Sequence, residues 1–158
     1  MNRVCLGRLS SPGIVVSLAL LILLPIAASA ALGDNEQSVV GDQARLKGTH
    51  RLIRGPKYSV HEISTPAGHV VHEFLSPSGT VFAVSWQGPA LVDLHTLLGS
   101  YFEQYTQVVA SRPPSPEAPT NINVPGLVFQ QSGHMRAFRG RAYVPSLIPQ
   151  GVDPGEIR

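Results

Sequence analysis

The sequence predicts a small α+β domain in which one long amphipathic helix packs on an antiparallel sheet of about five strands. Three observations support this prediction. Apolar and polar residues alternate over three consecutive runs, a helical apolar pattern follows them, and two further alternating runs come after a proline-rich interruption. Residues 31–158 should form this single domain, because about 130 residues suffice for one hydrophobic core.

The first thirty residues have the composition of a secretory signal peptide. Arg3 and Arg8 precede an apolar run at 14–26, and an Ala-Ser-Ala tripeptide at 28–30 supplies the small residues that signal peptidase recognises. The apolar run is shorter than the roughly 20 residues that a membrane-spanning helix needs. We therefore expect cleavage after residues 1–30, a periplasmic or secreted mature chain, and no remaining transmembrane helix.

Removal of this segment changes the charge balance. Of the 12 basic residues, Arg3 and Arg8 lie in it, whereas all 10 acidic residues follow it, so the mature chain is formally neutral. This neutrality argues against nucleic-acid binding. Cys5 is the only cysteine, so the mature chain has no thiol for a disulfide, a metal or a nucleophile. We expect a monomer that packing alone stabilises.

The first predicted elements are a short helix and a meander. The helix should run through about Leu46, because Asp34 and Gln37 resemble a capping box. Period-two alternation then predicts three antiparallel strands, at 58–64, 69–75 and 80–87.

The turns of this meander repeat one pattern, at 65–68 and at 76–79. Each has Ser or Thr, then Pro, any residue and Gly. Proline presets the backbone at the second turn position, and glycine tolerates the left-handed conformation at the fourth. These two segments therefore predict tight hairpin turns.

The clearest helical periodicity covers 94–110, where the apolar residues should form one stripe against the sheet. Five prolines at 111–126 then predict an extended surface loop. Two more strands are expected after it, at 127–132 and 135–144.

The end of the chain completes the expected architecture. Gly133 and His134 should form the turn of this C-terminal hairpin. Residues 145–158 contain three prolines and two glycines, which predict an extended tail.

Several strings of the chain have the character of a family signature. They are Tyr-Ser-Val-His-Glu at 58–62, Val-Phe-Ala-Val-Ser-Trp-Gln-Gly-Pro at 81–89, Leu-Leu-Gly-Ser-Tyr-Phe at 97–102, Ser-Gly-His-Met-Arg-Ala-Phe at 132–138, Gly-Arg-Ala-Tyr-Val-Pro at 140–145 and Pro-Gln-Gly-Val at 149–152. In these strings the chain resembles an uncharacterised family of exported bacterial proteins, the domain of unknown function 2844. The resemblance implies export and one compact domain, and it assigns no catalytic residue.

Three histidines of the predicted meander, His61, His69 and His72, are candidate ligands of zinc or another divalent metal. A four-residue first turn would place His61 opposite His72, whereas a shift by one residue would pair His61 with Glu73 and Glu62 with His72. Zinc usually takes four protein ligands, or three and a water, and Glu62 or Glu73 could complete such a set. The alternative is that these histidines only pair with carboxylates at the surface or across strands.

Four other residues are candidates for ligand binding. Arg139 and Arg141 share a strand face and could bind a carboxylate or phosphate group, or could simply form a solvated face. Trp86 could line a groove at the end of the sheet or pack in the core. His134 lies near Ser132, but no third triad group and no nucleophile-elbow motif accompanies them.

The sequence thus predicts a non-enzymatic, exported domain without a cofactor, which binds another envelope protein or a surface ligand. The alternative is a metal-binding envelope protein, or a metal-dependent enzyme, that uses the three meander histidines. A third possibility is an accessory subunit that a partner protein stabilises.

Overall fold

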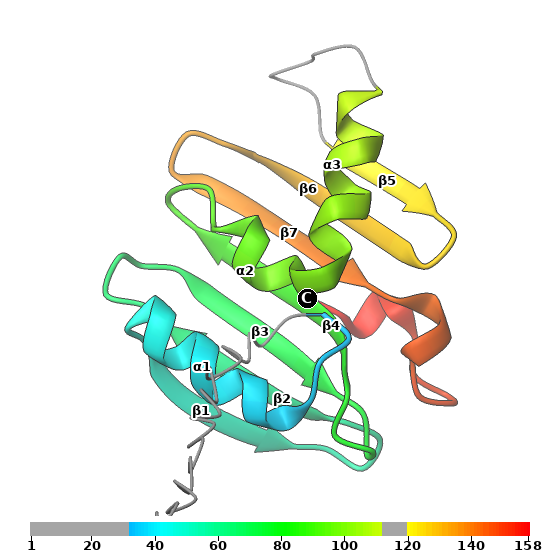
Figure 1. Cartoon of the computed structure of the whole chain (residues 1–158). Coiled ribbons are helices and arrows are strands. Elements are labelled where there is room, and N and C mark those ends of the chain that lie inside the picture. Colours follow the sequence, from blue (N-terminus) through cyan, green and yellow to red (C-terminus); the bar gives the residue numbers. More distant parts are fainter. Residues whose placement is uncertain (1–31, 112–119) are drawn as a thin grey trace, which may run out of the picture.

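Seven antiparallel strands form one sheet in the computed structural model, which describes residues 32–111 and 120–158. The expected signal peptide lies outside these residues. The strands are β1 (Thr49–Arg54), β2 (Ser59–Ser64), β3 (Val70–Leu75), β4 (Val81–Gly88), β5 (Thr120–Val124), β6 (Leu127–His134) and β7 (Ala137–Tyr143). Their order is β1-β2-β3-β4-β7-β6-β5 (Figure 1). The α+β class is confirmed, but the expectation of about five strands was too low.

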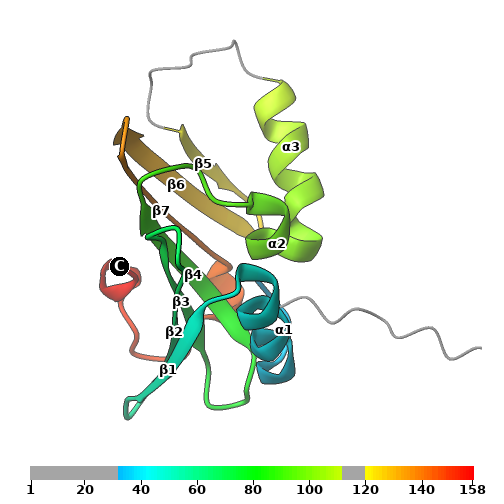
Figure 2. The same cartoon turned by 90° about the vertical axis from the view of Figure 1, so that its left-hand side faces the viewer.

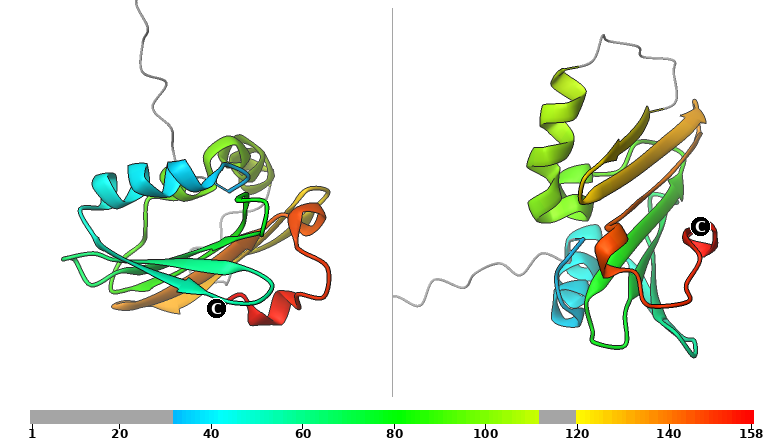
Figure 3. Two further views of the ribbon diagram at one scale, coloured as in Figure 1. Left: turned by 90° about the horizontal axis from the view of Figure 1, so that it is seen from below. Right: turned by 90° about the vertical axis from the view of Figure 1, so that its right-hand side faces the viewer.

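The α-helices of the described residues all cover one face of this sheet. They are α1 (Glu36–Leu46), α2 (Leu94–Leu98) and α3 (Phe102–Ala110). Figures 2 and 3 show these helices on one side, and the C-terminal segment on the other. We call the two sides the covered face and the open face. None of the helices within residues 32–111 and 120–158 has the length and apolar character needed to cross a membrane.

The helix predicted over 94–110 is divided at Gly99. Asp93 caps α2 by accepting hydrogen bonds from the backbone N–H groups of His95 and Thr96. Gly99 then takes φ 49° and ψ −121°, which is not helical, so α2 ends and a 3₁₀ turn at Gly99–Tyr101 leads into α3. Glycine permits this break because it has no Cβ.

The capping box predicted for α1 is also wrong. The N-cap is Asn35, whose Oδ1 accepts the Gln37 N–H at 3.0 Å. The helix ends at Leu46, as expected, and is followed by Lys47 in the left-handed conformation.

The predicted meander is confirmed as β2, β3 and β4. Gly68 and Gly79 both have φ near 80°, at 83° and 82°, as their turns require. The second of the two registers considered is the observed one, since His61 pairs with Glu73 and Glu62 with His72.

Two strands were missed, and each for a physical reason. β1 is exposed at five of six positions, so no apolar alternation marks it. β5 lies within the predicted loop 111–126, and only Ile122 of its five residues is buried. The hairpin turn also falls at Met135 and Arg136, not at Gly133 and His134, and Arg136 has φ 69°.

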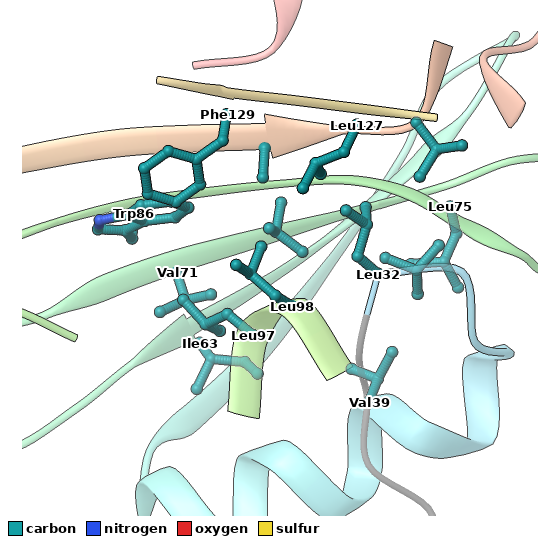
Figure 4. Packing of buried hydrophobic residues seen from close by; sticks show 14 of the residues in the cluster. Leu32, Val39, Ile63, Val71, Leu75, Trp86, Leu97, Leu98, Leu127 and Phe129 are labelled. Atoms are coloured by element: carbon teal, nitrogen blue, oxygen red, sulfur yellow. The ribbon is translucent and has the colours of Figure 1, made fainter. Parts of the chain in front are cut away.

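The apolar core lies mainly between the helices and the covered face (Figure 4). A second cluster on the open face joins Phe74, Phe82 and Ala83 to Val152 and Ile157 of the C-terminal segment. Ile157 is 1% exposed. The segment expected as an extended tail is therefore packed against the sheet.

Candidate functional site

One polar residue from every strand lies in a single row across the open face. Directly paired residues of neighbouring strands point to the same face, so the register defines the row. It comprises Arg51, Glu62, His72, Ser85, Arg141, Gln130 and Asn121, each opposite the next. We call these seven residues the central row.

Hydrogen bonds connect much of the central row. Arg51 Nη2 donates to Glu62 Oε2 at 2.9 Å, and His72 Nε2 lies 3.2 Å from the same oxygen. The bond from Arg51 lowers the pKa of Glu62; burial opposes this, and the contact with His72 adds to the lowering. On the other side, Arg141 Nε donates to Gln130 Oε1 at 2.7 Å. These groups of the central row therefore satisfy one another.

Side chains of the central row also bind residues 153–158, which we call the C-terminal strap. Arg141 Nη1 donates to the carbonyl oxygens of Pro154 at 2.9 Å and Ile157 at 3.2 Å. His72 Nδ1 lies 3.0 Å from the main-chain oxygen of Arg158. Arg141 is thus a structural group, because both its Nε and its Nη1 bind the protein itself.

A pocket of about 540 Å³ opens beside the strap. It is bordered by the strap, by the middle of the central row and by a second polar row two residues further along the strands. This outer row comprises Gln87, Arg139 and Ser132, which pair across β4, β7 and β6. No aspartate or glutamate lines the pocket within the described part of the chain. Its charged side chains are therefore cationic, and amides and hydroxyls surround them.

Arg139 differs from Arg141 in its contacts. It is exposed, and no hydrogen bond or ion pair engages its guanidinium group among residues 32–111 and 120–158. A guanidinium group offers two parallel N–H donors to a carboxylate or phosphate. Arg139 is thus the group of the pocket best placed to bind an anion.

The other two candidates for ligand binding lie elsewhere. Trp86 borders the pocket, but it is only 3% exposed, and its ring packs 5.6 Å from that of Phe129 on the covered face (Figure 4). Gly140 makes room for this ring, since a Cβ there would lie 2.3 Å from Trp86 Cζ2. His134 is exposed at the end of β6 and does not line the pocket.

The structure does not bring the three candidate metal ligands together. His61 points to the covered face, where its Nδ1 is 2.9 Å from His50 Nε2, whereas His72 lies on the open face. His69 precedes β3, with its Nε2 3.1 Å from the carbonyl oxygen of Ala90. No cluster of three or more His, Cys, Asp or Glu residues suited to a metal occurs in the described ranges.

Glu62, His72 and Ser85 lie in the order of an acid, a base and a nucleophile. However, Ser85 Oγ is 3.4 Å from His72 Nδ1, while the main-chain oxygen of Arg158 is closer to the same nitrogen, at 3.0 Å. Ser85 is also only 3% exposed. The imidazole is therefore arranged to bind Glu62 and the strap, not to activate the hydroxyl.

A second polar cluster is buried beneath α1. Glu73 and Asp42 are fully buried, and burial raises the pKa of Glu73 well above its usual value, with Asp42 raising it further. Burial also lowers the pKa of His61, which lies 3.8 Å from Glu36; His50 and Arg54 add to the lowering, and Glu36 opposes it. Both groups are thus shifted toward their neutral forms.

The sequence indicated Arg139, Arg141 and His72 but missed the rest of this site. Ser85, Gln87 and Ser132 lie in the family strings, which assign them no role, and Gln130 and Asn121 lie in none. Only the strand register places the five residues together. The signal in the sequence was partial: the predicted strands 80–87 and 127–132 each place two of these residues on one face, Ser85 with Gln87 and Gln130 with Ser132.

Residues 28–157 match a protein family described as Protein of unknown function (DUF2844). The chain belongs to this family. No curated protein and no solved structure matches it. Membership confirms the resemblance in the sequence strings, while the site itself has to be interpreted from its own chemistry.

Proposed function

We propose that this DUF2844 domain is a non-enzymatic binding domain, which takes a polar ligand carrying a carboxylate or phosphate group in the open-face pocket. The observation that supports this most directly is Arg139, a guanidinium group without a protein partner among the described residues, on the wall of a pocket without acidic side chains. An anion there would gain charge-assisted hydrogen bonds without competing with an aspartate or glutamate side chain of the pocket.

The neighbours of Arg139 suit the rest of such a ligand. Gln87 and Ser132 are its direct partners in the register, and both line the pocket. Amide and hydroxyl groups both donate and accept hydrogen bonds, so they can bind the hydroxyl groups of a sugar or polyol. A hydroxylated acid, such as a uronic acid, combines these two features.

Binding is favoured over catalysis because the described residues that line the pocket include no activated nucleophile. Its serine beside an imidazole, Ser85, is nearly inaccessible, and the imidazole of His72 is engaged with Glu62 and the strap. We further propose that the domain acts after export, in the periplasm or outside the cell, as the signal-like segment at 1–30 implies. A surface glycan or another envelope protein would then be the source of the anionic group.

Calorimetric titration of the exported protein with glucuronate and with inorganic phosphate tests the proposal. We expect saturable binding of at least one of them, and weaker binding of glucose, which lacks the carboxylate. Arg139→Gln should weaken binding by about tenfold or more, since hydrogen bonds to charged groups contribute about 1.5–3 kcal/mol.

The matched control is Arg136→Gln, which removes an exposed arginine at the turn of the same hairpin. It should bind like the wild type. Equal affinity of the Arg139→Gln and wild-type proteins would contradict the proposal, as would equal binding of glucose and glucuronate. The metal alternative remains a prediction, which elemental analysis of protein purified without chelator would test.

A further inference from the structure

β1 is an edge strand that is exposed on both of its faces. It pairs with β2 alone, and five of its six residues are exposed, Leu52 being half-buried. No other strand lies beyond it among residues 32–111 and 120–158, so alternate backbone N–H and C=O groups point outward from the sheet. Such an edge can pair with one further strand.

The chain around β1 is strongly basic. Residues 43–61 contain five basic side chains and no acidic one, although the mature chain as a whole is formally neutral. Glu62 pairs with Arg51, but Arg54 is exposed and has no ion pair with a described carboxylate. β5, at the opposite edge of the sheet, carries no charged side chain. The positive charge therefore belongs to the β1 edge.

This charge disfavours a second copy of the chain as the partner. In every antiparallel self-pairing of β1 that overlaps five or six residues, Arg51 lies directly opposite or diagonal to an arginine of the other copy. Like charges at these positions destabilise a strand pair. An acidic strand would instead bring carboxylates to this edge, next to Arg54 on one face of β1 or next to Arg51 on the other.

We propose that the β1 edge is a docking site for an extended, acidic segment of a partner protein, which adds to the sheet as a further strand. Backbone hydrogen bonds would supply affinity, and the arginines would select for acidic residues. Ile53, which is 43% exposed, offers an apolar contact on the same strand. This site lies on a different element from the pocket residues, so it can be tested independently of the proposed function.

The test uses a fluorescent peptide of alternating glutamate and valine with the full exported protein. Fluorescence anisotropy should show saturable binding, and hydrogen exchange should show new protection of the β1 amides. Arg54→Gln should weaken binding by about threefold, the magnitude expected for one exposed charge. Arg136→Gln, an equal charge change at the far hairpin turn, should not alter it.

A peptide that is N-methylated at alternate residues separates strand addition from simple charge attraction, because it keeps the carboxylates but loses backbone donors. We expect it to bind at least about tenfold more weakly. Equal binding of both peptides, or no binding of either, would overturn the proposal; in the second case the arginines only protect the edge against aggregation. A β1-linked dimer in sedimentation analysis would overturn it too.

Discussion

The two faces of the sheet differ in how fully their polar residues are hydrogen-bonded. On the covered face, Glu73 and His61 are buried beneath α1, and neither the Glu73 carboxyl oxygens nor His61 Nε2 has a hydrogen-bond partner among the described residues. On the open face, Glu62 and His72 occupy the adjacent positions of the same strands and bind each other. A glutamate and a histidine therefore reduce the stability of the fold on the covered face, where these atoms are buried without hydrogen bonds. On the open face the same residue types form a hydrogen-bonded network.

This difference separates stability from function. The covered face packs against three helices and excludes water. The size and shape of its side chains are therefore constrained by close packing. The open face is ordered by its apolar cluster, its central row and the strap, and the outer row remains free to bind a ligand under the proposal. The following substitutions test this separation, from the largest expected effect to the smallest.

Phe129→Ala should cause the largest loss of stability. The ring is fully buried on the covered face and contacts both Trp86 and Tyr105. Loss of a buried phenylalanine costs about 3–5 kcal/mol of unfolding free energy, which urea denaturation would measure. Ser132→Ala, on the open face of the same strand, should change stability by less than about 0.5 kcal/mol. Similar losses of unfolding free energy in the two variants would contradict the proposed difference between the faces.

Arg141→Gln should destabilise less, by about 2 kcal/mol, because it removes charge-assisted bonds to Pro154 and Ile157. The loss should concentrate in the C-terminal strap. Hydrogen exchange of residues 155–158 should accelerate more than that of β3. Uniform acceleration over the whole chain would show that Arg141 does not act through the strap.

Glu73→Gln should raise stability at neutral pH. The folded pKa of Glu73 lies above its usual value near 4.5, so its contribution to stability is complete below that value and is lost as pH rises through the folded pKa. The neutral amide removes this loss, and the gain over the wild type should grow with pH in urea titrations from about pH 4 to about pH 8.

Glu62→Gln is the matched control on the open face. The pKa of Glu62 in the folded protein is lowered. Its contribution to the free energy of unfolding is therefore present above the usual pKa, and it is lost as the pH falls through the folded-state pKa. This variant should therefore be less stable than the wild type at neutral pH. The same sign of change in both variants would contradict the comparison between the faces.

Arg139→Gln should leave stability within about 0.5 kcal/mol of the wild type, because the side chain is exposed and contacts no described partner. Thermal unfolding without ligand checks this expectation. A large destabilisation would show that Arg139 is a structural residue like Arg141.

The sequence predicted the parts of the fold in which one face of an element is buried. β2 and part of β3 alternate because one side is more buried, whereas β4 is buried on both sides over its first six residues. The proline-glycine turns fix the connections between these strands. β1 and β5 bury too little to show a pattern, and the break at Gly99 depends on the backbone of one residue. The packing of the strap was missed because only two residues of the segment 145–158, Val152 and Ile157, are buried.

The site was predictable only as single residues. Arg139 could be recognised by its chemistry, but its environment depends on which residues of β4 and β6 lie opposite it. A shift of one residue in either register would move Gln87 or Ser132 to the other face. Local sequence does not determine that register, because it is set by the packing of the whole sheet.

The central claim, that the open-face pocket binds an anion through Arg139, is tested most directly by nuclear magnetic resonance titration of the labelled protein with glucuronate and with inorganic phosphate. Shifts should concentrate at Gln87, Ser132 and Arg139, spare α1 and the covered face, and disappear in Arg139→Gln. Shifts that persist in this variant, or that map to the helices, would contradict the account.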